Sequence, residues 1–187
     1  MTDTTQATYV APPATNYGVP TFWREITDQR RLVELVASHV IQHLMSQGEP
    51  AEESGLGCRY RLAKPDGRVL ACGIGCMISD AAYARFAPTA EQIESWDMDD
   101  EPNGPQCLLE NKLANSEPVE TALRDSGVNI DDGRHGAPLR DFLTRVQNIH
   151  DSISDVTRWP GMIEIAKQYA LGRYDGWQEA EQAREHA

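Results

Sequence analysis

A sustained apolar stripe between positions 138 and 153 constrains the fold of this chain most strongly. After Pro138, apolar residues recur at spacings of three and four, which is the period of one helix face. They are Leu139, Phe142, Leu143, Val146, Ile149 and Ile153. His150 belongs to the same stripe. The pattern predicts a long helix that packs its apolar face into a core.

A second long helix is expected directly after Thr27. Thr27 can cap its N-terminus and Gly48 can end it, while the apolar positions between them again follow one side of a helix. Those positions are Leu32, Val36, Val40 and Leu44. Shorter helices are predicted over 80–86 behind Ser79, over 90–96, over 106–114, over 117–126 before Gly127, and over 162–171 before Gly172.

Residues 58–72 carry the one clear β signal. CRYRL and RVLAC flank KPDG, in which Pro65, Asp66 and Gly67 suit the positions of a tight turn. A lone hairpin is marginal in water, so it must pack on helices or join further strands. The predicted class is therefore α+β, a mostly helical single domain with a small antiparallel hairpin or sheet packed against helices. We expect a flexible N-terminal arm at 1–20, a globular domain at 21–172 and a polar tail at 173–187.

Composition narrows the function classes. The chain has 187 residues, a formal net charge of −12 and a pI near 4.8, which argues against general nucleic-acid binding. Neither a signal segment nor an apolar run of membrane-spanning length is visible, and four cysteines are too few for a disulfide scaffold. These features favour a reduced, cytoplasmic protein without membrane contact.

The stretch CGIGC at 72–76 offers several kinds of chemistry. Zinc sites need a second pair of ligands, and redox pairs usually have two intervening residues where this chain has three. Gly73 and Gly75 allow a phosphate to approach the backbone, although no complete phosphate-binding motif is present. The favoured interpretation is a tight turn in which cysteines pack as small apolar residues, with no metal and no cofactor. His39 and His43 lack the Glu of a zinc-hydrolase motif.

Polar side chains around the hairpin form the better candidate site. Arg59 and Arg61 share a strand face and present two guanidinium groups, which suit a carboxylate or phosphate. The expected ligand-binding residues are Arg59, Tyr60, Arg61, Gly73, Gly75, Asp80, Tyr83 and Gln147. If the protein is an enzyme, His150 and Asp151 are the expected catalytic residues.

These residues also carry a resemblance. The C-R-Y-R and D-G motifs at 58–67, C-G-I-G-C-M-I-S-D-A-A-Y at 72–83 and F-L-x-x-V-Q-N-I-H-D at 142–151 resemble a family of small tailed-phage and prophage proteins. The match is loose at 43–47. The matching positions are Cys58, Tyr60, Arg61, Cys72, Gly75, Cys76, Asp80, Tyr83, Gln147, His150 and Asp151. In that family the residue that matches Cys76 can be histidine, which leaves a metal site at the cysteines as an alternative.

The resemblance and the arginine cluster together give the functional hypothesis. We expect a phage accessory protein in the host cytoplasm that counters host defence by sequestering a small anionic ligand, most simply a nucleotide immune signal. One alternative is a nucleotide-signal hydrolase that uses His150 with Asp151 or Asp80. Another is an inhibitor or adaptor that binds a host protein through its tails. Tyr9, Val10 and Tyr17 in the arm are candidates to dock on a partner chain, and a homo-oligomer is one outcome.

Overall fold

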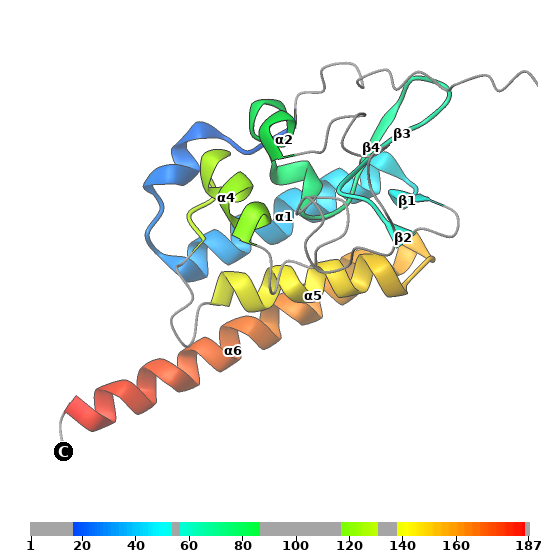
Figure 1. Ribbon diagram of the computed structural model, residues 1–187. Coiled ribbons are helices and arrows are strands. Elements are labelled where there is room, and N and C mark those ends of the chain that lie inside the picture. The colour runs from blue at the N-terminus through cyan, green and yellow to red at the C-terminus, as the bar shows by residue number, and fades with distance from the viewer. Residues whose placement is uncertain (1–16, 54–56, 87–116, 131–137, 186–187) are drawn as a thin grey trace, which may run out of the picture.

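The computed structural model describes residues 17–53, 57–86, 117–130 and 138–185, and Figure 1 shows their arrangement. The fold is α+β and mostly helical, as predicted. In chain order the helical elements are η1 Thr21–Glu25, α1 Gln29–Gln47, η2 Gly75–Met77, α2 Asp80–Phe86, α4 Glu117–Asp125, α5 Pro138–Ser152, η4 Val156–Arg158 and α6 Trp159–Glu185. The strands are β1 Glu52–Glu53, β2 Gly57–Cys58, β3 Arg61–Ala63 and β4 Val69–Ala71.

The three long helices α1, α5 and α6 build the centre of the protein. Helices α5 and α6 are joined by η4 and lie side by side, and α1 packs on both (Figure 1). The apolar stripes predicted for α1 and α5 are buried. The largest fully buried side chains are Trp159, Phe142, Leu32, Leu44, Ile74, Met77, Ile78, Leu123, Leu139 and Leu143. Three helices and the segment around 74–78 therefore share one core.

Of the three caps predicted for α1 and α2, two are confirmed and the third differs by one residue. The side chain of Asp28 accepts hydrogen bonds from the backbone amides of Arg30 and Arg31, so Asp28, and not the predicted Thr27, is the N-cap of α1. Gly48 ends α1 with φ +75°, as expected. The Ser79 hydroxyl accepts from the Ala82 amide at 3.2 Å, which confirms the predicted cap of α2.

Two small antiparallel sheets replace the single hairpin. Strand β3 pairs with β4 in the register Leu62 to Leu70, and Gly67 has φ +85° in the turn between them, as the KPDG signal predicts. Strand β1 pairs with β2. The predicted continuous strand 58–62 is broken between β2 and β3, because the Arg59 amide donates to the Ala51 carbonyl at 2.8 Å.

Helix α6 is the largest departure from the sequence-based expectation. Gly172 was predicted to end it, but the helix continues through the expected polar tail to Glu185. Glycine lowers helix stability by about 1 kcal/mol and does not by itself break a helix. Gly172 therefore lowers the stability of α6 without ending it.

The arm boundary also needs correction. The Tyr17 hydroxyl donates to the Val69 carbonyl at 2.6 Å, and the Gly18 amide donates to the Cys76 carbonyl at 3.0 Å. Residues 17 and 18 are thus packed on the protein's own β4 and η2, so the predicted arm cannot extend to residue 20. Residues 1–16, including Tyr9 and Val10, lie outside the described residues. So do the helices predicted at 90–96 and 106–114, Ser116 and Cys107.

Candidate functional site

Arg61 lies at the centre of the predicted ligand-binding cluster. Its Nη1 donates to Asp80 Oδ1 at 2.6 Å, and its Nη2 donates to the carbonyl of Ile78. The guanidinium lies between two aromatic rings, 4.7 Å from the ring centre of Tyr17 and 4.5 Å from that of Tyr83. The Arg61 side chain is only 5% exposed. Its hydrogen-bonding capacity is therefore directed at its own chain.

Tyr17 belongs to this cluster although no local sequence pattern indicates it. The contacts join residues more than forty positions apart, and no spacing rule connects them. Burial raises the pKa of the Tyr17 phenol, while the nearby Arg61 charge opposes that rise. The arrangement of Tyr17, Arg61 and Tyr83 fastens the start of the described chain and α2 to the hairpin.

The other predicted ligand-binding residues near the hairpin lie at different depths. Tyr60, Arg61, Asp80 and Tyr83 come together as predicted, and Tyr60 is buried. Arg59 is half-buried and lies outside strand β3, so the two arginines do not share one strand as expected. The paired fork was predicted from the alternation of a continuous strand, and the structure breaks that strand at Tyr60, so the alternation does not apply to Arg59.

The glycines of the junction face protein atoms. A Cβ on Gly75 would lie 1.8 Å from the Tyr60 carbonyl oxygen, and a Cβ on Gly73 would lie 2.6 Å from a methyl of Val146. Cys72 Sγ accepts from the Gly75 amide at 3.3 Å, and Cys76 Sγ donates to the Gly73 carbonyl at 3.4 Å. Glycine at these positions lets β3, η2 and α5 approach closely.

The cysteine thiols are held in a low-dielectric environment. Cys72 and Cys76 are both buried, and burial raises the pKa of Cys76 well above its usual value. A thiol that stays protonated is a poor nucleophile and a poor metal ligand. Their surroundings match the interpretation that they pack as small apolar side chains. The Cys58 side chain lies outside what the structure describes.

His39 and His43 on α1 face the same junction. His43 Nε2 lies 3.3 Å from the Ala71 carbonyl, and the His43 ring makes an edge contact with Tyr17. The His39 ring makes an edge contact with Trp23. Burial lowers the pKa of both histidines. Both histidines are packed between α1 and the junction, and His43 bonds the Ala71 carbonyl at the end of β4.

His150 binds the loop that follows α1. Its Nε2 accepts from the Ala51 amide at 3.3 Å, so the neutral ring carries its proton on Nδ1. The ring stacks on Trp159 with centres 5.2 Å apart, and Asp151 Oδ1 lies 3.7 Å from Nδ1. The side chain is 1% exposed. The predicted catalytic histidine is therefore almost fully buried among the described residues.

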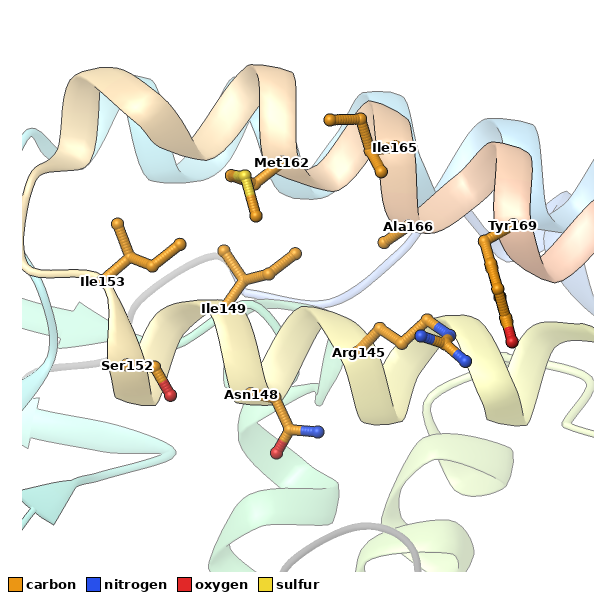
Figure 2. A pocket seen from close by; sticks show the side chains of 9 residues that line it. All are labelled: Arg145, Asn148, Ile149, Ser152, Ile153, Met162, Ile165, Ala166 and Tyr169. Atoms are coloured by element: carbon orange, nitrogen blue, oxygen red, sulfur yellow. The ribbon is translucent and has the colours of Figure 1, made fainter.

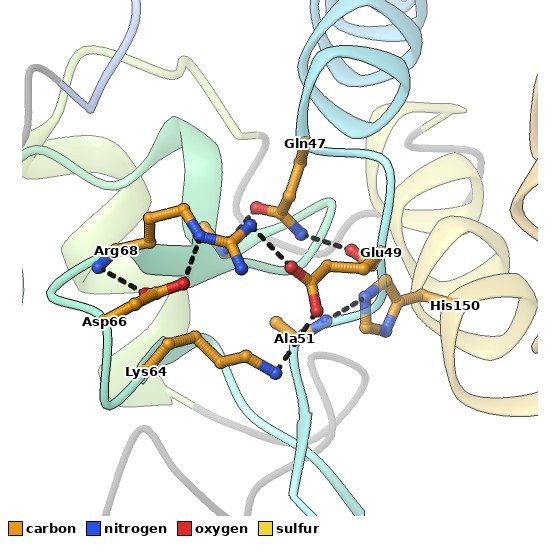
Figure 3. Close-up of polar contacts among 8 residues, drawn as sticks. Gln47, Glu49, Ala51, Lys64, Asp66, Arg68 and His150 are labelled. Atoms are coloured by element: carbon orange, nitrogen blue, oxygen red, sulfur yellow. Dashed lines mark hydrogen bonds and ion pairs between the residues drawn. The ribbon is translucent and has the colours of Figure 1, made fainter.

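Figure 3 shows that the same loop is held on its other side by charged groups. Glu49 pairs with Arg68 at 2.7 Å and with Lys64 at 3.2 Å, and Gln47 Oε1 accepts from the Ala71 amide at 2.7 Å. Loop 48–51 thus links the β3–β4 hairpin to α5. Gln147, the last predicted ligand-binding residue, is buried on α5 one turn before His150.

An accessible hollow lies elsewhere, along the seam between α5 and α6 (Figure 2). Its volume is about 340 Å³. In Figure 2 the side chains of Ile149, Ile153 and Met162 extend into the space between the two helices. Ile165 and Tyr169 at its edge are 61% and 51% exposed. Sequence patterns missed the hollow because it depends on how two helices pack.

One end of this α5–α6 pocket is cationic. The guanidinium of Arg145 lies 3.8 Å from the Tyr169 ring centre, and that of Arg173 lies 5.9 Å from it. Both arginines share Asp141, at 3.3 Å and 3.8 Å. Two positive charges against one carboxylate leave a local excess of one positive charge. The end of the pocket therefore combines an aromatic face with cationic hydrogen-bond donors.

Three further findings bound the site. Among the described residues no group of three or more His, Cys, Asp or Glu side chains is placed to hold a metal ion. None of the helices in the described ranges combines the length and apolar composition needed to cross a bilayer. Comparison with protein-family models, with curated proteins and with solved structures gives no match for this chain.

Proposed function

We propose that the protein is a non-catalytic binding protein that sequesters a small anionic ligand in the α5–α6 pocket. The observation that carries the proposal is the accessible apolar hollow with Arg145 and Tyr169 at one end. Binding sites for small ligands are hollows of roughly 300 to 1,000 Å³ with apolar walls and a few polar groups. The α5–α6 pocket fits this description at its lower limit.

Two features of the pocket favour a ligand with a flat ring and a negative charge. The Tyr169 ring offers a face for stacking, and the Arg145 guanidinium lies against that face. Asp141 is the carboxylate that the described residues place against Arg145, through Nε. The Nη groups of a guanidinium are hydrogen-bond donors that suit an anion, and we assign this role to those of Arg145. A nucleotide has both a flat ring and a negative charge.

The groups predicted for ligand binding at the hairpin support a structural role instead. Arg61 is enclosed by Tyr17, Tyr83 and Asp80, and His150 is buried against Ala51 and Trp159. A buried, internally bonded histidine gives no support to the hydrolase alternative. The resemblance to phage proteins supports the wider setting of the proposal, in which the sequestered ligand is a nucleotide signal of host defence.

Calorimetric titration of the full chain with a panel of nucleotides tests this function. We expect at least one nucleotide to bind, and Arg145→Ala to weaken it about tenfold, because charge-assisted hydrogen bonds contribute roughly 1.5 to 3 kcal/mol. Arg31→Ala, at an exposed position on α1, is the matched control and should leave binding unchanged.

Three outcomes would contradict the proposal. The first is that no nucleotide binds, and the second is that Arg145→Ala binds as well as the wild type. The third is turnover of a nucleotide that His150→Ala abolishes while the protein stays folded, which would establish the hydrolase.

A further inference from the structure

The outward face of α6 carries an uncharged stripe. Ile165, Tyr169, Gly172 and Gly176 follow at spacings of four, three and four, so they lie on one side of the helix. All four are exposed. An exposed helix face in a chain with a net charge of −12 is expected to be charged, so this stripe is an unusual feature of the surface.

The glycines of the stripe have no explanation within the chain. A Cβ at Gly172 or Gly176 would meet nothing within 4 Å. Each glycine inside a helix is about 1 kcal/mol less favourable than alanine. Glycine is favoured where another backbone must approach closely. The described part of the chain supplies no such backbone here.

Helix α6 also extends beyond the rest of the protein. Figure 1 shows its C-terminal part running past the ends of α1 and α5, the two long helices on which it packs. An isolated helical segment of this length is marginal in water and gains its stability from packing. The stripe reaches Gly176, beside Asp175, whose carboxylate pairs with Arg30 near the start of α1.

We propose that a second copy of this chain binds along the stripe, with the two α6 helices antiparallel. A two-fold axis at position 174 places Gly172 of each copy opposite Gly176 of the other. The backbones cross closely at these glycines, and the interface is the same patch on both copies, as a closed dimer requires. In this register residues 179–183 of one copy lie beside Ile165 and Tyr169 of the other.

Charge complementarity favours this occupant over an unrelated chain. Arg145 and Arg173 give the region around Tyr169 an excess of positive charge. Glu179 falls on the same side of α6 as the stripe, whereas Asp175 pairs with Arg30 and Glu181 and Glu185 lie on the opposite side of the helix. Antiparallel pairing places Glu179 of each copy opposite Tyr169 of the other, where Arg145 supplies the positive charge. The overall charge of −12 opposes association at long range, and salt screens that repulsion together with the attraction.

The available area predicts a weak dimer. Residues 165–183 of a helix span about 28 Å. Two helices paired over that length, with α5 of each copy alongside, bury on the order of 1,000 Å² in total, the lower limit for a specific interface. Interfaces of this size are typical of weak, transient complexes, so we expect a dissociation constant on the order of micromolar.

Sedimentation equilibrium of the full chain without nucleotide tests the proposal. We expect the average mass to rise from monomer to dimer between about 1 and 300 µM. Gly176→Leu should keep the protein monomeric, because the new side chain blocks the close approach. The same change raises helix propensity, so the variant should unfold at an equal or higher denaturant concentration, which separates lost association from misfolding.

Ile165→Glu and its matched control complete the test. Ile165→Glu should weaken association at least about tenfold, whereas Met45→Glu, at an exposed apolar position on α1, should leave it unchanged. A monomer throughout the concentration range would overturn the proposal. A dimer that persists in Gly176→Leu would overturn it as well. In this dimer the second copy covers Ile165 and Tyr169, which also line the α5–α6 pocket, so dimerisation and ligand binding compete. Because the measurement uses no nucleotide, its failure leaves the ligand-binding proposal to be judged by its own titration.

Discussion

Arg61 illustrates how a side chain that suits an anion can be bonded inside its own protein, through Nη1 and Nη2, while its buried Nε has no hydrogen-bond partner among the described residues. Its guanidinium bonds Asp80 and the Ile78 carbonyl and lies between the rings of Tyr17 and Tyr83. Arginine is the residue that such a layered, bidentate environment favours, because its planar fork stacks and donates at once. The planar guanidinium that predicts ligand binding from sequence also lets arginine join two segments of its own chain.

Replacing Arg61 should therefore affect stability. We expect Arg61→Ala to lower the free energy of unfolding by roughly 3 kcal/mol, because it removes the buried guanidinium that bonds the Ile78 carbonyl and Asp80 and packs between the rings of Tyr17 and Tyr83. Urea unfolding followed by circular dichroism measures this change. Arg31→Ala, at an exposed position, should alter it by less than about 0.5 kcal/mol. An Arg61→Ala variant as stable as the wild type would show that the fastening is unimportant.

Gly75 gives a second prediction at the residue scale. Gly75→Ala should lower the free energy of unfolding by about 3 kcal/mol or more, because the added Cβ collides with the Tyr60 carbonyl oxygen and the backbone there must move. Gly161→Ala makes the same chemical change in open space on α6 and should be neutral or slightly stabilising. Thermal or urea unfolding of the two variants compares them. Equal stabilities would contradict the close packing at the junction.

At the scale of elements, sequence patterns predicted the helix faces, caps and turns that depend on residues close together in the chain. The α5 stripe, the cap at Ser79 and the turn at Gly67 each depend on neighbours within a few positions, and all three are confirmed. The extension of α6 past Gly172 and the packing of Tyr17 on Val69 depend on distant contacts or on a small propensity difference. The α5–α6 pocket arises only from the packing of two helices, so no single segment could indicate it.

Helix α1 should make the protein sensitive to acid. Burial lowers the pKa of His39 and His43 in the folded state, whereas unfolded histidine titrates near 6.5. At pH values between the lowered folded pKa and the unfolded pKa, the unfolded chain binds more protons than the folded chain. The stability that the neutral rings contribute is therefore complete above about pH 6.5 and is lost as pH falls through the lowered folded pKa.

The urea midpoint at several pH values measures this effect. We expect a lower midpoint at pH 5 than at pH 7.5 in the wild type. In the variant His39→Gln/His43→Gln the difference should be smaller, whatever its absolute stability. A pH dependence that is the same in both proteins would assign the acid sensitivity to other groups.

At the scale of the whole molecule, polar chemistry and accessibility lie in different places. Titratable side chains gather around the 72–83 junction, where they are bonded to their own chain. The accessible hollow lies along α5 and α6, where the walls are mostly apolar and Arg145 supplies the charge. Because of this separation we relate the junction to stability and propose the α5–α6 pocket for ligand binding.

Methyl NMR of the full chain, titrated with a nucleotide that binds in calorimetry, tests this assignment most directly. We predict that the methyl signals of Ile149, Ile153 and Met162 in the pocket shift until the ligand saturates the site, while those of Ile74 and Ile78 beside the junction stay unchanged. Shifts confined to Ile74 and Ile78, with the pocket methyls unchanged, would contradict it and return the ligand to the site around Arg61.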